Sequence, residues 1–124
     1  MDTLDNSYID IHPLLEEVEG NTTICKMLIE SFIKDIDSYV NTMNSELNTN
    51  NFPALYQVAH KIIPSIRIFN IDKLEPIILE LESKLKNHED LECIKKNIET
   101  SIEIFNLVKT ELLSEHKSIE NAAS

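Results

Sequence analysis

Apolar residues recur at steps of three and four along most of the chain, which is the spacing of amphipathic α-helices. Sustained alternation of apolar and polar residues, the pattern of a half-buried strand, is nearly absent. The pattern predicts helices over about 13–20, 22–47, 52–69, 72–86 and 91–113. Asn21–Thr23 and Asn48–Asn51 supply candidate N-caps for the second and third segments, and Asp72 with Glu75 suggests a capping box for the fourth.

Each longer segment carries one apolar stripe, which we expect to face a shared core. In the second segment the stripe, interrupted by Ser31, is Ile24, Met27, Leu28, Phe32, Ile36, Tyr39, Val40, Met43 and Leu47. In the third it is Leu55, Val58, Ala59, Ile62, Ile66 and Phe69. In the fourth it is Leu74, Ile77, Ile78, Leu81 and Leu85. In the last it is Leu91, Ile94, Ile98, Ile102, Phe105, Val108 and Leu112.

Four amphipathic helices joined by short loops predict an all-α fold. The arrangement we expect is an up-down-up-down four-helix bundle preceded by a short N-terminal helix. With 124 residues the chain has room for one core, so residues 1–124 are predicted to form a single domain. The apolar pattern thins beyond Ser114, which predicts a frayed tail from about residue 115.

Composition excludes several classes of function. Gly20 is the only glycine, whereas P-loop and dinucleotide sites need several glycines for backbone approach to phosphate. The formal charge of -11 argues against nucleic-acid binding and suits a partner with a basic surface, although solvated helix faces explain it more simply. We therefore expect no nucleotide site, no cofactor and no enzyme activity of the chain's own.

Localisation and metal binding are predicted from what the sequence lacks. It shows no signal-peptide pattern and no apolar run near the roughly 20 residues that cross a bilayer, so we expect a cytoplasmic protein without membrane contact. We also expect a monomer. Cys25 and Cys93 lie far apart, which favours two reduced thiols over a disulfide. No CxxC or HxxxH spacing supports a metal site.

His60 is the residue with the clearest chemical potential. It falls just outside the apolar stripe of its helix, beside the polar Gln57 and Lys61 and on the same side as Arg67. An imidazole titrates near neutrality, so a histidine presented to solvent offers a neutral nitrogen nucleophile at physiological pH. A lone exposed histidine is usually just a surface residue, and the flanking pattern is what favours a function here.

Other polar residues have simpler interpretations. His12, His88 and His116 are dispersed and lie at a helix start, a turn and the predicted frayed end. Tyr56, one turn before His60, is equally suited to packing at the edge of the bundle and to touching a partner. The remaining candidates are acidic residues that we interpret as a solvated face rather than an acid–base pair: Glu80, Glu82, Glu89, Asp90 and Glu92.

The region around His60 resembles the histidine phosphotransfer (HPt) domain of two-component phosphorelays. The residues that carry the resemblance are Ala59-His60-Lys61-Ile62-Ile63-Pro64, then Asn70, Leu74 and Leu81-Glu82. The family pattern is Ala-His-x-Leu-Lys-Gly, a later glycine, then leucine and a Leu-Glu pair on the next helix. In helix order and length the resemblance covers roughly Ile11 to Leu113. It implies that His60 is the phosphoacceptor.

Three positions depart from that pattern: Ile63 replaces the lysine, Pro64 replaces the first glycine and Asn70 replaces the later glycine. In the family the lysine supports the phosphohistidine, and the first glycine leaves room for the partner. Pro64 is compact enough to leave the approach to His60 open, although it cannot donate to the His60 carbonyl and should bend the helix.

Arg67, the only arginine, is the substitute that we predict for the lysine. Side chains seven residues apart on a helix lie about 20° off line and about 10 Å apart along the axis. Helical side chains lean toward the N-terminus, so Arg67 would lean toward His60, and its planar guanidinium suits phosphoryl oxygens. Lys61 would contribute only at the edge of such a site.

These observations support three hypotheses. In the first, His60 receives a phosphoryl group from the aspartate of a response-regulator receiver or hybrid sensor histidine kinase and passes it to another receiver. The partner would dock on the surface around His60, with predicted contacts from Tyr56, Gln57, Lys61, Ile63 and Pro64. In the second, a degenerate HPt-like module docks such a partner without transfer. In the third, the chain is a helical adaptor in which His60 has no role.

Overall fold

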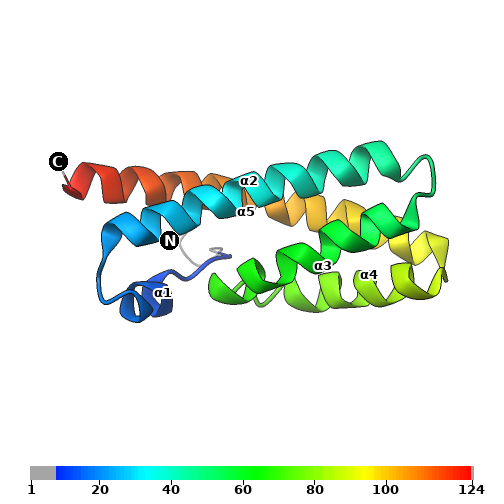
Figure 1. The fold of residues 1–124 in the computed structure, drawn as a ribbon, viewed down its shortest axis with the longest axis horizontal. Helices are drawn as coiled ribbons and strands as arrows, with labels where there is room; N and C mark the ends of the chain where they lie inside the picture. The colour runs from blue at the N-terminus through cyan, green and yellow to red at the C-terminus, as the bar shows by residue number, and fades with distance from the viewer. Residues whose placement is uncertain (1–7, 124) are drawn as a thin grey trace, which may run out of the picture.

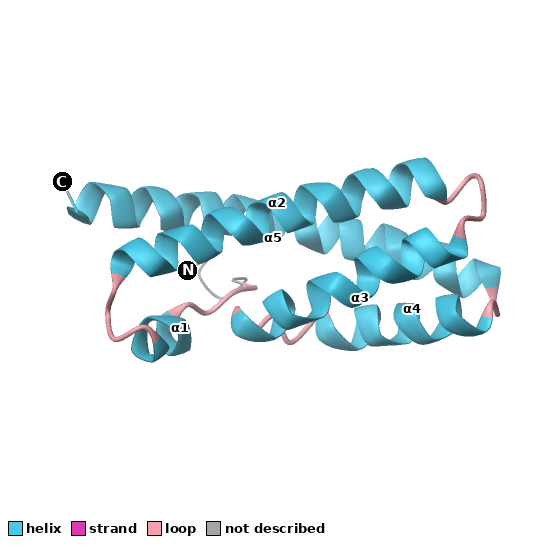
Figure 2. Ribbon diagram, in the orientation of Figure 1, coloured by secondary structure: helices cyan, strands magenta, loops and turns pink. Residues whose placement is uncertain are grey.

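The computed structural model describes residues 8–123, and these residues are mostly helical, with no strand among them. The helices are α1 (His12–Glu17), α2 (Thr22–Glu46), α3 (Phe52–Ile68), α4 (Glu75–Asn87) and α5 (Leu91–Ala123). Figure 2 shows that short loops join them. The all-α class predicted from the apolar spacing is therefore confirmed.

The four longer helices lie along the long axis of the molecule, and the chain changes direction at each connection between them (Figure 1). α3 packs against α2 and α4, and α5 packs against the same two helices. α1 packs against α2. Each long helix therefore turns its apolar stripe toward a common interior.

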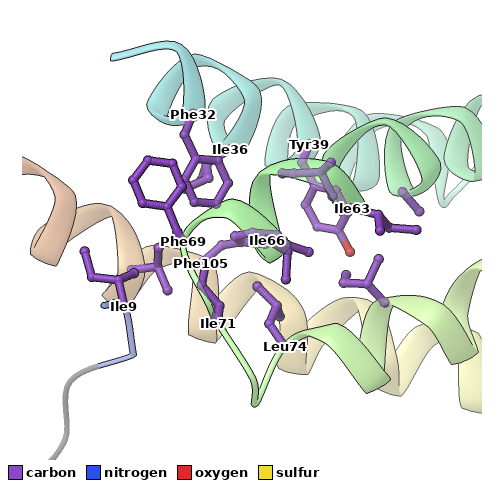
Figure 3. Packing of buried hydrophobic residues seen from close by; sticks show 14 of the residues in the cluster. Ile9, Phe32, Ile36, Tyr39, Ile63, Ile66, Phe69, Ile71, Leu74 and Phe105 are labelled. Carbon is purple, nitrogen blue, oxygen red and sulfur yellow. The ribbon is translucent and has the colours of Figure 1, made fainter. Parts of the chain in front are cut away.

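The core contains most of the positions that the apolar stripes predict. Figure 3 shows part of it, including Phe32 of α2 stacked on Phe69 at the end of α3, with ring centroids 4.9 Å apart. One polar pair lies inside: the Tyr39 hydroxyl is 2.7 Å from the Ser101 hydroxyl, which itself donates to the carbonyl of Ile98 at 2.8 Å. Burial raises the pKa of Tyr39, so its hydroxyl stays protonated and donates to Ser101.

An extended segment before α1 closes one end of the core. Ile9 and Ile11 are buried, and the backbone N–H groups of Tyr8 and Ile9 donate to the Glu111 carboxylate at 2.9 and 3.2 Å. The N–H of Asp10 donates to the carbonyl of Phe69 at 3.2 Å. These bonds tie the segment to α5 and to the end of α3.

The helix caps agree in part with the sequence. The side chains of Asn21 and Asn51 accept from the N–H groups of Ile24 and Ala54, so both predicted N-caps are confirmed. The capping box predicted from Asp72 and Glu75 is wrong, because α4 begins at Glu75 with Leu74 as its N-cap and no side-chain cap bond.

The N-terminal turns of α2 are rotated relative to our prediction. Cys25 and Ile29 are fully buried, whereas Ile24 is 43% and Met27 61% exposed. Apolar residues at 24, 27, 28 and at 25, 29 form two overlapping stripes, and the packing of α2 against its neighbours decides between them.

The last part of the chain, where the sequence suggested a frayed tail from about residue 115, is helical, since α5 continues to Ala123. His116 Nε2 lies 2.6 Å from Glu30 and Lys26 Nζ lies 3.1 Å from Glu120, so polar contacts join this last part of α5 to α2. Ile119 also packs against the core.

Among the described residues, no helix combines the length and the apolar character that a membrane span needs.

Two isoleucines on α2 test this packing. Ile29→Ala should lower the free energy of unfolding by about 2–5 kcal/mol because it leaves a cavity in the core. Ile24→Ala, the same change at an exposed position, should cost less than about 1 kcal/mol. Urea unfolding followed by circular dichroism measures both, and equal costs would contradict the helix phase described here.

Candidate functional site

His60 lies on α3 next to the buried Ala59, and its side chain is 66% exposed. The apolar stripe of α3 is held in the core, so the helix presents its polar flank outward at this point. The structure therefore places His60 where the sequence predicted it, on the solvent side of a well-packed helix.

The imidazole contacts a carboxylate of the neighbouring helix α4. Nδ1 of His60 is in hydrogen-bond contact with Oε2 of Glu82, whose side chain is only 19% exposed. An ionised carboxylate can only accept a hydrogen bond, so Nδ1 carries the proton in the neutral ring and Nε2 holds the lone pair. The interpretation of Glu82 as part of a solvated face does not fit its low exposure and its contact with the imidazole of His60.

A second pair joins the same helices one heptad away. Nε of Arg67 donates to Oε2 of Glu75 at 2.7 Å. Arg67 lies seven residues after His60 and Glu75 seven residues before Glu82, as antiparallel helices require. In this structure Arg67 points to Glu75, so its predicted role beside His60 requires that it leave this partner.

One face of the imidazole stacks on an aromatic ring. Tyr56 lies one turn earlier on α3, and the two rings are nearly parallel, with centroids 5.7 Å apart and an interplanar angle of 11°. Tyr56 is half-buried and packs against the core. His60 therefore has contacts on a ring edge and on a ring face.

An open groove of about 790 Å³ lies beside His60, between α2 and α3. Three of the predicted docking residues line it: Tyr56, Gln57 and Lys61. α2 contributes Ser38 and Thr42, which the sequence analysis did not single out. Nothing in the apolar pattern marks these two residues, because only the packing of α2 on α3 brings them to the groove that His60 also lines.

Ile63 and Pro64, the other two predicted docking residues, differ in their exposure to solvent. Pro64 is exposed, as predicted, and lies inside a helix that continues to Ile68. Ile63, also predicted to contact a docking partner, is only 6% exposed and so offers little surface to one. Its side chain belongs to the core because position 63 lies four residues after the buried Ala59 and three before the buried Ile66, on the side of α3 that packs against other helices.

The backbone conformation at position 70 explains why asparagine can stand where the HPt pattern has glycine. Its φ of 55° is in the left-handed region that favours glycine and that asparagine also tolerates. The N–H of Asn70 donates to the Arg67 carbonyl at 3.2 Å and that of Ile71 to the Ile66 carbonyl at 3.1 Å. These two bonds form a Schellman motif, so asparagine fills the structural role of a helix-ending glycine.

The remaining candidates do not join the site. His12 contacts Asp10, His116 contacts Glu30, and His88 lies edge-on to Phe52. Cys25 and Cys93 are both free thiols, and burial is the main cause that raises the pKa of each. No group of three potential metal ligands occurs among residues 8–123.

Glu80 shows that the acidic residues of α4 differ from one another. It accepts a hydrogen bond from Asn97 of α5 at 2.8 Å, and this bond is the main cause that lowers its pKa. Glu80 therefore faces α5, whereas Glu82 contacts His60 on α3.

Comparison of the chain with protein-family models, with curated proteins and with solved structures gives no match. The site is therefore interpreted from its own geometry.

Position 63 can be tested directly. Ile63→Lys should lower the free energy of unfolding by roughly 2–3 kcal/mol, because it places an ammonium group at a buried position. Ile63→Met, which keeps an apolar side chain of similar size, should cost less than about 1.5 kcal/mol. Urea unfolding measures both variants. A lysine that costs no more than methionine would show that position 63 can present a cation to solvent.

Proposed function

We propose that this chain is a phosphocarrier of the HPt type, in which the four longer helices form an up-down-up-down bundle and His60 accepts the phosphoryl group. The observation that carries the proposal is the exposed imidazole of His60 with its Nδ1 held by Glu82. This arrangement leaves one nitrogen nucleophile, Nε2, on a rigid helix beside a groove. The resemblance around Ala59-His60 supports the same function.

The transfer step needs only this nitrogen from the chain. The Nε2 lone pair of His60 attacks the phosphorus of an aspartyl phosphate on the partner. The N–P bond forms as the P–O bond to the aspartate breaks, and the aspartate leaves as a carboxylate. In the neutral ring no proton has to leave Nε2, because the single ring proton is on Nδ1, which contacts Glu82.

Glu82 also compensates charge during the step. Formation of the N–P bond draws electrons from the imidazole, so positive charge develops on the ring. A carboxylate already bonded to Nδ1 stabilises this charge without reorganisation. The negative phosphoryl group is then on Nε2, across the ring from Glu82, which limits the repulsion between them.

The partner would approach over α2 and α3. The groove beside His60 and the exposed Gln57, Lys61 and Pro64 form the docking surface that we propose for a receiver domain or hybrid sensor histidine kinase. By the resemblance, the receiver supplies Mg²⁺ and most of the charge compensation for the phosphoryl oxygens. Arg67 contributes to binding phosphate only if it exchanges Glu75 for the phosphoryl group.

The resemblance also leads us to propose a cytoplasmic, monomeric protein.

One observation favours docking without transfer as a second candidate function. Ile63 is buried where the family has its lysine, so no cation stands at this position. In that case the same groove would hold the partner while the phosphoryl group stayed on its aspartate.

Incubation with a phosphorylated receiver separates the candidates. The parent protein should take up acid-labile, alkali-stable label, and His60→Gln should abolish it, with little change in stability because the side chain is mostly solvent-exposed. Label that persists in His60→Gln would rule out His60 as the acceptor. Binding without label would support the docking module, and neither binding nor label would support a plain adaptor.

Glu82 provides a more specific test of the mechanism. Glu82→Ala should slow phosphorylation of His60 about tenfold, since a charge-assisted hydrogen bond contributes roughly 1.5–3 kcal/mol and partial exposure reduces it. The freed ring should also divide the label between Nδ1 and Nε2, which ³¹P NMR distinguishes.

Glu80→Ala is the matched control, because Glu80 lies on the same helix but bonds to Asn97. It should transfer at the parent rate with label on Nε2 alone. Equal behaviour of the two variants would mean that Glu82 does not set the tautomer.

A further inference from the structure

The stacking of Tyr56 on His60 suggests a role that differs from partner binding. The two residues are four apart on α3, a spacing that brings side chains together on one helix face. Their rings are nearly parallel, and Tyr56 is anchored by its contact with the core while His60 is largely exposed. The tyrosine is therefore the more firmly held partner of the pair.

An imidazole on a helix has two side-chain torsions to restrict. The contact with Glu82 fixes the direction of Nδ1, but it still allows the ring to swing about that bond. The contact with Tyr56 limits this swing by restricting the plane of the ring. Together the two contacts hold the direction in which Nε2 points.

We propose that Tyr56 is a positioning residue for phosphorylation of His60, and this inference rests on the proposed phosphocarrier function. The flat face of Tyr56 keeps the imidazole plane aligned for attack. It also lies against the ring while positive charge develops there, an arrangement that aromatic faces stabilise. The hydroxyl of Tyr56 plays no part in this role.

A small phosphoryl donor separates positioning from docking. With phosphoramidate, the Nε2 lone pair forms the N–P bond as the P–N bond of the donor breaks and ammonia leaves. No protein partner is present, so a residue that acts only in docking leaves the rate of this reaction unchanged. A residue that positions the imidazole alters it.

Tyr56→Leu should slow phosphorylation of His60 by phosphoramidate about two- to tenfold, the range expected for loss of one aromatic contact. Tyr56→Phe keeps the ring face and should react at the parent rate. Asn44→Ala, at an exposed position of α2 outside the groove, is a further control and should also match the parent. Leucine retains apolar packing at position 56, and circular dichroism checks that each variant is folded.

NMR chemical shifts provide a second measurement, because a change in stability alone would not alter the contact between the two rings. The His60 ring protons should lose the ring-current shift from Tyr56 in Tyr56→Leu and keep it in Tyr56→Phe. Parent-like reaction of Tyr56→Leu, with label on His60, would overturn the inference and leave the phosphocarrier proposal standing. Equal slowing by phenylalanine would overturn it as well, because the hydroxyl would then be the active group. Label that does not reside on His60 would overturn both proposals.

Discussion

The packing of α3 against α4 is the contact on which the candidate site depends. Ile62, Ile63 and Ile66 of α3 and Ile78 and Leu81 of α4 are all buried. Full burial of such side chains contributes about 1.5–3 kcal/mol each, whereas an exposed ion pair contributes about 0–1 kcal/mol. The apolar residues therefore set the register of the two helices. The contacts of His60 with Glu82 and of Arg67 with Glu75 follow from it.

This dependence explains why the site is both exposed and well defined. A histidine on the surface of a helix would normally sample several rotamers. His60 instead meets a mostly buried carboxylate on one side and an anchored tyrosine on another. The core fixes these neighbours, and they in turn restrict the imidazole, while the groove between α2 and α3 keeps one approach open.

The departures from the HPt pattern have different physical meanings once the backbone is known. Asn70 is not a glycine, but it adopts the left-handed backbone conformation that ends the helix. Ile63 differs from lysine in its environment as well, because it is buried. Asparagine at position 70 can therefore take the structural role that glycine has in the HPt pattern, whereas no cation stands at position 63. Arg67, the only arginine of the chain, forms an ion pair with Glu75 instead.

The sequence by itself determined the all-α class, the positions of most helices, the two asparagine caps and the exposure of His60. These properties depend on the local spacing of apolar residues and on helix capping, and both involve residues that are only a few positions apart in the chain. Tertiary structure decided the rest. The rotation of α2, the helical end of α5 and the burial of Ile63 depend on which neighbouring helix covers each face. The partners of His60 and Arg67 stand 22 and 8 residues away in the chain, and only the register of α3 on α4 brings them together.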